Sequence, residues 1–463
     1  MTTRFANRLW SNRHFESLES PASIETVEIA SGLRIRRGTV KHTIQSSRSI
    51  TNTSHGSLWL AALLLTLSAT LLQAQPKTRT EEIEQQRREK MAVLWPERES
   101  PLVDKVNGMV EKGLLDGAQT GKGKNGWQVT MGGMRPGQGA SFGAGYRRTD
   151  ILRDLIGVRG TARGTFQQAY MFDLEIDVQK LRSEKSYLDF YLKYENSPQM
   201  DYYGPGFDSS KEDITSYRLE DTSADLRGGI ELLPNLVLGA NLGGLLVHTG
   251  RGRRGGVPST DEVFDSAPGL NRNTTFGRWG ADVIYDYLDN RNGPRSGGFY
   301  AARFDSYHDL DRQEFSFRQW QFEARQFIPY FNKSRVIALR IRTTLSFANS
   351  GQLIPFYRQP SLGGNDSIRG FDLYRFYDDH SVLATIEHRW HSFSGLDVAL
   401  FVDAGKVAAR KADLDLSDLA YSGGIGFRFK IKGTVVSRID FAAGREGFRA
   451  MWTFNDIFTR PFE

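Results

Sequence analysis

From residue 127 onward, apolar and polar side chains alternate with a period of two. Residues 171–177 (MFDLEID) alternate apolar residues with three carboxylates, and residues 187–193, 337–342 and 425–432 repeat this alternation. Because successive side chains of a β-strand point to opposite faces, each segment predicts a strand with one apolar and one polar face. About fifteen such strands can be recognised. They are separated by turn-rich segments such as DNRNGPRSGG and RGRRGGVPSTDE.

The number of strands and the length of residues 127–463 predict a closed barrel in a membrane. Closed bacterial barrels have an even number of strands, so we expect about sixteen. Sixteen strands leave about 21 residues for each strand and its connection, which suits about ten residues across the bilayer plus a loop. Open sheet edges do not occur in lipid. The predicted fold class is therefore an all-β, transmembrane antiparallel β-barrel.

The alternative for the same pattern is a soluble β-sandwich or β-propeller, whose half-buried strands also alternate. Two features favour the membrane barrel. The polar faces carry charges in strand after strand, opposite aromatic side chains. Tryptophans also recur in or near the predicted strands, as the aromatic girdle of a membrane barrel requires. These tryptophans are Trp127, Trp279, Trp320, Trp390 and Trp452.

Composition narrows the class of protein further. The chain of 463 residues has no cysteine, which excludes a disulfide framework and thiolate metal sites. Its mean hydropathy of −0.45 excludes a helical membrane bundle but permits a barrel, because every second barrel residue faces a wet lumen. Residues 1–75 hold eight Arg or Lys and four Asp or Glu, so they supply +4 of the net charge of +6. The nearly neutral remainder gives no reason to expect a nucleic-acid partner.

The N-terminal region has the features of a secretory signal. Residues 58–72 (LWLAALLLTLSATLL) form an uncharged apolar run, followed by Gln73-Ala74-Gln75. The run is shorter than the roughly 20 residues that a membrane-spanning helix needs, and a small residue such as Ala74 suits a cleavage site. We expect residues 1–75 to be a cleaved signal peptide with an unusually long leader, for which a misassigned start is the preferred explanation. The alternative is an uncleaved membrane anchor.

Residues 76–126 predict a helical linker rather than a folded domain. Ser100-Pro101 is a helix-opening pair, apolar residues follow at helical spacing up to Leu114, and a flexible GAQTGKGKNG segment leads into the strands. A segment of about fifty residues is marginal as an independent domain. The predicted organisation is thus signal peptide (1–75), helical periplasmic linker (76–126) and barrel (127–463).

One decapeptide interrupts the strand pattern. Residues 362–371 (LGGNDSIRGF) form a polar loop in which Gly363 and Gly364 precede a single arginine, Arg369. Further along, residues 401–405 read FVDAG. Together these motifs resemble the inserted loop and following strand of the BamA/TamA superfamily of outer-membrane assembly barrels, also called the bacterial surface antigen family. The resemblance covers most of the barrel region and is supported by the segments DYLDNR (286–291), IEHR (386–389) and RIDFA (438–442).

Strand parity places two carboxylates on the inner face near this loop. In residues 382–390 and 397–403 the apolar side chains share one face, which leaves Glu387 and Asp403 pointing into the lumen. The resemblance implies that the inserted loop folds back into the lumen and that Arg369 meets these carboxylates in a strong, oriented contact. The loop residues of this predicted luminal clasp are Arg369, Gly370, Phe371, Gly363 and Gly364, the glycines permitting bends and close backbone approach.

Two simpler interpretations of Arg369 stay open at this point. In an arbitrary β-protein, an arginine in such a polar segment is most often an ordinary exposed loop residue. Even inside the lumen, the clasp can be a purely structural contact that holds the barrel together without serving its activity.

The resemblance implies a role in the insertion, assembly or translocation of proteins at the outer membrane of a Gram-negative bacterium. Family members usually carry periplasmic polypeptide-binding modules before the barrel, and the short linker here departs from that pattern. By resemblance, a weak seam between the first and last strands opens toward lipid or a nascent strand. Glycine weakens strand pairing, so the candidate seam residues are Gly132, Gly133, Gly444 and Gly447.

Enzymatic activity is not expected. The sequence has no Ser/His/Asp or histidine–metal spacing that strand parity would bring onto one luminal face, and no Gly-x-Ser-x-Gly nucleophile turn. Expected partners are outer-membrane lipid, nascent outer-membrane proteins and periplasmic or lipoprotein accessory factors, with no metal and no cofactor. The alternative function is that of a passive porin or structural barrel of the same fold.

Overall fold

The computed structural model describes residues 125–132, 134–178, 185–393, 395–431 and 433–454, together with Ile83 and Phe458. The predicted signal peptide lies outside these residues, as do Gly133 and nearly all of the predicted linker. The linker residue Ile83 is helical. No helix within the described segments is long and apolar enough to cross a membrane.

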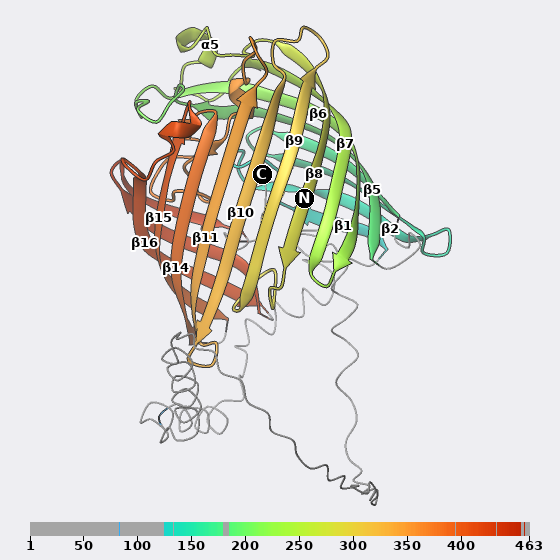
Figure 1. Cartoon of the computed structure of the whole chain (residues 1–463), viewed down its shortest axis with the longest axis vertical. Helices are drawn as coiled ribbons and strands as arrows, with labels where there is room; N and C mark the ends of the chain where they lie inside the picture. The colour runs from blue at the N-terminus through green and yellow to red at the C-terminus, as the bar shows by residue number, and fades with distance from the viewer. Residues whose placement is uncertain are drawn as a thin grey trace, which may run out of the picture. The chain divides into compact units, whose positions relative to one another are not determined.

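Sixteen antiparallel strands form one sheet in which consecutive strands are neighbours (Figure 1). Two very short strands, β12 and β13, pair separately within the connection between β11 and β14. The predicted all-β, transmembrane antiparallel barrel of about sixteen strands is confirmed. The strands of the main sheet are β1 (Gly126–Met131), β2 (Ser141–Ile151), β3 (Ile156–Thr165), β4 (Tyr170–Val178), β5 (Ser186–Tyr202), β6 (Thr215–Leu233), β7 (Leu236–Arg251), β8 (Asn273–Asp286), β9 (Gly297–Asp309), β10 (Phe317–Tyr330), β11 (Arg335–Ala348), β14 (His380–Phe393), β15 (Leu396–Ala408), β16 (Ala420–Ile431), β17 (Thr434–Gly444) and β18 (Gly447–Thr453).

Several strands are longer than the membrane thickness alone demands. β5 and β6 have 17 and 19 residues, against the expected length of about ten across the hydrocarbon layer. Their far ends carry Tyr202 and Tyr217 into a buried aromatic cluster with Phe356, at ring-centroid distances of 4.9 and 4.7 Å. The extra length of these strands therefore packs against a connection of the barrel itself.

The two faces of the sheet have opposite chemistry. In β4, Phe172 is 52% exposed, whereas Asp173 and Asp177 on the other face are 5% and 2% exposed. The tryptophans Trp127 and Trp452 lie on the apolar outer face and are also exposed. A barrel in lipid requires this arrangement, because its outer surface contacts hydrocarbon and its interior holds the polar groups. The bulkiest fully buried side chains include five arginines, Arg325, Arg340, Arg369, Arg428 and Arg438.

The connections differ at the two ends of the sheet. At one end, here the short-turn end, strands are joined by tight turns such as residues 234–235 and 331–334. At the other, the long-loop end, the connections include residues 203–214, 252–272 and 349–379. The short helix α5 (Thr260–Val263) belongs to one of these long connections and lies at the top of Figure 1.

The connection of residues 349–379 is packed against the inner wall, and we call it the luminal loop. It contains the 3-10 helix η1 (Phe356–Arg358) and the paired strands β12 (Ser361–Leu362) and β13 (Phe376–Tyr377). Its apolar residues Ile368 and Phe371 are fully buried against Leu383 of β14 and Val407 of β15. Burial of these side chains is what draws the loop into the barrel.

One connection at the short-turn end reaches across the barrel. In residues 287–296, the side chain of Asn290 donates to the carbonyl of Gly433 at 3.1 Å, and the carbonyl of Asn292 accepts from the backbone N–H of Val435 at 2.7 Å. These residues join β8 to β9, whereas Gly433 lies between β16 and β17, on a distant part of the sheet. This crossing connection therefore extends over part of the opening at the short-turn end.

Candidate functional site

The predicted clasp begins with a tight bend in the luminal loop. Gly363 has φ +115, and a Cβ on it would collide with the carbonyl oxygen of Asp372. Only glycine combines this backbone conformation with so close an approach. The hydroxyl of Ser367 accepts from the Gly363 N–H at 2.7 Å, and Gly364, also at positive φ, completes the bend. This bend aims the next residues of the loop at the barrel wall.

Arg369 is fully buried and binds carboxylates on two strands. Its Nε and Nη2 donate to the two oxygens of Asp403 at 2.8 and 2.9 Å, and its Nη1 donates to Glu387 at 3.1 Å. Its backbone N–H also donates to Asp403, at 3.2 Å. The guanidinium lies over the ring of Phe401, with Cζ 3.3 Å from the centroid. Both strands are therefore linked through one loop residue.

The register of β14 against β15 explains how one guanidinium reaches both carboxylates. Thr385 lies directly opposite Asp403, and Glu387 lies opposite Phe401, so the two acids occupy diagonal positions on the inner face. Diagonal neighbours across an antiparallel pair are within reach of a long side chain. The hydroxyl of Thr385 donates to Asp403 at 3.0 Å, which orients that carboxylate toward the loop.

The structure adds residues to this site that the sequence analysis did not include. Arg428 of β16 binds Glu387 at 2.9 Å and Asp440 of β17 at 2.6 Å. Arg438 binds the other oxygen of Asp440 at 3.0 Å and reaches Asp366 in the luminal loop at 2.6 Å. Strand parity places these side chains inside the barrel. Which of them come into contact depends on the register of neighbouring strands, which parity does not give. We call the eight charged residues the clasp cluster: Arg369, Arg389, Arg428, Arg438, Asp366, Glu387, Asp403 and Asp440.

The clasp cluster contains four cations and four anions, so its charges balance. Burial alone would lower the pKa of the Arg369 guanidinium, but Asp403 and Glu387 outweigh burial, and the pKa is raised above its ordinary value. Arg369 therefore stays charged. A balanced set of charges in hydrogen-bond contact is the arrangement under which buried ions are tolerated.

Gly370 brings the luminal loop against the last strands. A Cβ on Gly370 would lie 2.6 Å from the Cβ of Ser422 in β16 and 2.9 Å from the backbone nitrogen of Gly444 in β17. A Cβ on Gly444 would in turn lie 3.2 Å from the ring of Phe371. The loop residues Gly370 and Phe371 thus contact one of the candidate seam glycines directly.

Replacing Gly370 by alanine should displace the loop from these strands. The added methyl group meets backbone and Cβ atoms that cannot swing away, and overpacking of this kind costs about 1–3 kcal/mol. Urea unfolding of the protein in detergent micelles should show this loss. Gly255→Ala is the matched control, because a Cβ there has no heavy atom within 4 Å. Equal unfolding midpoints for the two variants would contradict the close-approach argument.

The described seam glycines lie at or next to strand ends, and Gly444 pairs with Gly447 where β17 turns into β18. The described ladders join β1 only to β2 and β18 only to β17. Gly132 follows the end of β1 with φ +68, and Gly447 begins β18 with φ +119. Gly444 is the last residue of β17. At Gly132 and Gly447 the glycine serves the backbone conformation of a strand end, and a weak seam at the candidate glycines stays a prediction.

The luminal loop also contacts both flanks of the candidate seam. The hydroxyl of Tyr374 donates to the carbonyl of Pro136, which follows β1, at 3.3 Å. On the other flank, Asp372 forms an ion pair with Arg449 of β18. The loop that carries Arg369 therefore touches the first and the last strand regions within three residues of its own sequence.

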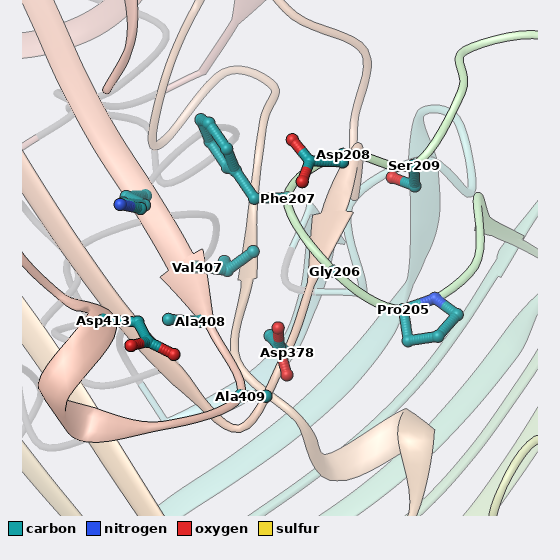
Figure 2. A pocket seen from close by; sticks show the side chains of 11 residues that line it. Pro205, Gly206, Phe207, Asp208, Ser209, Asp378, Val407, Ala408, Ala409 and Asp413 are labelled. Atoms are coloured by element: carbon teal, nitrogen blue, oxygen red, sulfur yellow. The ribbon is translucent and has the colours of Figure 1, made fainter. Parts of the chain in front are cut away.

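A pocket of about 500 Å³ opens at the long-loop end (Figure 2). Asp208, Asp378 and Asp413 contribute carboxylates to its lining. Lys406 also lines it, but its ammonium group is bonded to Asp415 at 2.8 Å. Burial, with the nearby carboxylates of Asp379 and Asp413, raises the pKa of Asp378 from 3.8 to about 6.

The raised pKa of Asp378 makes stability fall as the pH rises. Between about pH 4 and pH 6 the folded state holds a proton that the unfolded state has lost, so stability decreases through this range and stays lower above it. Asp378→Asn should remove this decrease. The variant should therefore be more stable than the parent at pH 7.5 but not at pH 4, as measured by the midpoints of urea unfolding in micelles. An equal difference in unfolding midpoint between variant and parent at both pH values would refute the assignment.

Within the described part of the chain, no group of three or more His, Cys, Asp or Glu side chains is arranged to hold an ion. The carboxylates of the clasp cluster are bonded to guanidinium groups instead.

Comparison with known proteins agrees with this architecture. The model of the Omp85 superfamily domain matches residues 137–444. No curated protein matches the sequence. Among solved structures, BamA from Haemophilus ducreyi lacking POTRA domains 1–3 has a TM-score of 0.54 at 17% identity, covering 72% of this chain and 71% of that one. CdiB from Escherichia coli has a TM-score of 0.47 at 14% identity, covering 69% of this chain and 60% of that one.

The matched family domain spans more than half of the chain, and the similarity to BamA shows a shared barrel fold. The resemblance drawn from the LGGNDSIRGF and FVDAG motifs is thereby confirmed. The chain belongs to the Omp85 superfamily and is an outer-membrane β-barrel of that family.

Proposed function

We propose that this barrel inserts, assembles or translocates proteins at the outer membrane, and that it does so through a seam between β1 and β18. The observation that carries the proposal is the position of the luminal loop. Within five residues, 370–374, it contacts Gly444 of β17, Arg449 of β18 and Pro136 after β1. A loop held in this way can bias whether the two edges stay together.

The lengths of the edge strands support the same proposal. β1 has 6 residues and β18 has 7, whereas the strands from β5 to β11 have 13 to 19. A shorter ladder offers fewer backbone hydrogen bonds, and each such bond contributes about 0.5–1.5 kcal/mol net. The β1–β18 edge is therefore the place where the barrel wall separates at least cost.

Locking this seam should abolish activity. The chain has no natural cysteine, so one cysteine placed in Gly126–Met131 and one in Gly447–Thr453 can form only one disulfide within the molecule. In vesicles containing the oxidised protein, insertion of newly synthesised outer-membrane barrels should fall to the level of empty vesicles. A reductant should restore it.

The matched control places the cysteines at Leu174 and Leu192, which lie opposite each other in β4 and β5. This cross-link leaves the seam free and should not slow insertion. If the seam-locked protein inserts substrates as fast as its reduced form, the gating role is wrong.

The proposed role is non-enzymatic, with lipid, nascent outer-membrane proteins and accessory factors as partners. The second candidate is a passive porin of the same fold. A sixteen-stranded barrel is wide enough for an aqueous channel, which favours that candidate unless the lumen is filled. The buried luminal loop favours assembly over conduction, and the conductance experiment in the Discussion separates the two.

A further inference from the structure

Phe458 follows β18 in sequence but is buried on a distant part of the inner wall. Its side chain is fully buried and packs with Phe327 of β10 and with Val336 and Ala338 of β11. In the order of the sheet, β14, β15, β16 and β17 lie between β11 and β18. Phe458 therefore lies inside the barrel, against strands that are not neighbours of β18.

Phe458 is contacted through both its ring and its backbone carbonyl. Its ring meets that of Phe327 edge to face, with centroids 5.3 Å apart and an interplanar angle of 74°. The guanidinium of Arg389 lies over the Phe458 ring, with Cζ 4.9 Å from the centroid. Nη1 of Arg325 donates a hydrogen bond to the Phe458 carbonyl oxygen. The pocket thus recognises an aromatic ring attached to a peptide carbonyl.

Any aromatic residue in an extended peptide presents these two features. Ring and carbonyl recognition do not depend on covalent linkage to β18. We propose that this socket is a binding site for an aromatic residue of an extended polypeptide, and that Phe458 occupies it as an internal ligand. The socket is formed by Arg325, Phe327, Val336, Ala338 and Arg389.

The socket lies close to the short-turn end of the barrel. Phe327 is three residues before the end of β10, and Val336 is the second residue of β11. Leu288, in the crossing connection, packs against the same cluster. A polypeptide that enters the lumen from this end meets the socket before it reaches the luminal loop.

One socket arginine shares a carboxylate with the clasp. Nε of Arg389 donates to one oxygen of Glu387 at 2.7 Å, and the other oxygen of Glu387 accepts from Arg369 at 3.1 Å. A ligand that attracts or displaces the Arg389 guanidinium therefore acts on the carboxylate that holds the loop arginine.

The other socket arginine reaches the loop by a second route. Arg325 and Arg340 both donate to the same oxygen of Glu323, each at 2.8 Å. Arg340 also donates to the carbonyl of Asp366 in the luminal loop at 3.1 Å. Two short chains of ion pairs and hydrogen bonds thus connect the occupant of the socket to the loop.

A peptide in trans should bind when the internal ligand is removed. The probe is a fluorescently labelled, C-terminally amidated peptide of residues 455–461 (NDIFTRP), which contains a single aromatic residue. In detergent micelles, fluorescence anisotropy should show binding to full-length Phe458→Ala that is about tenfold tighter or more than binding to the parent. Folding of each variant is checked by its heat-dependent mobility on a gel.

Matched peptides and variants make the result specific. A peptide with alanine in place of Phe458 should not bind, and one with tyrosine there should still bind. The chain variant Phe454→Ala, which alters a 45% exposed aromatic residue on the outer face, should behave like the parent. Adding Phe327→Leu to Phe458→Ala should weaken binding, since it removes the ring edge but keeps the apolar volume.

Two results would overturn the assignment. One is equal affinity of the peptide for the parent and for folded Phe458→Ala. The other is binding of the alanine peptide as tightly as the phenylalanine peptide. The inference goes beyond the proposed function and does not depend on it, because the peptide assay involves neither the seam nor substrate insertion.

Discussion

Replacing Arg369 by alanine should lower the free energy of unfolding by about 3–5 kcal/mol, the range for removing one partner of a buried ionic group. The guanidinium is fully buried and makes four hydrogen bonds to Asp403 and Glu387. The backbone bond survives in the variant, but the three side-chain bonds are lost. Both carboxylates then stay buried with less opposing charge. Urea unfolding in micelles, followed by tryptophan fluorescence, measures the loss.

Arg449→Ala is the matched control for this prediction. Arg449 also pairs with the luminal loop, through Asp372, but its side chain is 36% exposed. A pair at such a position is worth about 0–1 kcal/mol. Arg369→Lys should lose an amount of stability between those of Arg369→Ala and Arg449→Ala, because lysine keeps the charge but lacks the planar guanidinium. If Arg369→Ala is no less stable than Arg449→Ala, the buried clasp does not stabilise the barrel.

Removing the luminal loop should convert a closed barrel into an open channel. Barrels of sixteen to eighteen strands enclose an aqueous pore when nothing fills them, so single-channel conductance should rise by roughly tenfold or more. The variant replaces residues 354–377 with a short Gly-Ser linker. Asp403→Asn is included, because this carboxylate would otherwise lose Arg369 as a partner, whereas Glu387 keeps Arg389 and Arg428. Planar-bilayer recordings of the parent and the variant give the comparison.

Shortening residues 410–418 is the control for the loop deletion. That connection also lies at the long-loop end, and its residues Leu416 (83% exposed) and Lys411 are exposed. Its removal should leave conductance unchanged. A parent that already conducts as strongly as the loop deletion would favour the passive porin.

Strand parity predicted the faces of the barrel wall well, because the two-residue repeat is a local property of the chain. It placed Glu387 and Asp403 inside, and both are fully buried there. It placed Leu400 and Val402 outside, where they are 50% and 54% exposed. Strand length was harder to predict, since alternation continues where a strand such as β6 extends past the bilayer to pack against a loop.

Register was not readable from the same pattern. Parity puts Arg428 and Asp440 on the inner face, but their contact depends on how β16 is aligned against β17, where Gly426 lies opposite Asp440. A turn one residue longer would change that alignment without altering the alternation. The clasp could therefore be predicted for Arg369, Glu387 and Asp403, which sequence motifs mark, and not for the residues that surround them.

Phe458 shows a second limit of the sequence pattern. Trp452 and Phe454 are exposed on the outer face at two-residue spacing, and an extended continuation would place Phe458 on that face too. The chain instead leaves the strand after Thr453, so parity no longer applies. The local sequence does not predict that an aromatic residue beyond the strand contacts Arg325 and Phe327, which lie more than a hundred residues earlier in the chain.

The balanced charges of the clasp cluster constrain how this barrel can change over evolutionary time. Any single neutralising substitution among the eight residues passes through a protein with one unmatched ion in its interior. Lineages that lose Arg438 should therefore also have altered Asp366 or Asp440, its two carboxylate partners. Loop and wall are expected to diverge together, in compensated pairs, even though they lie in different parts of the gene.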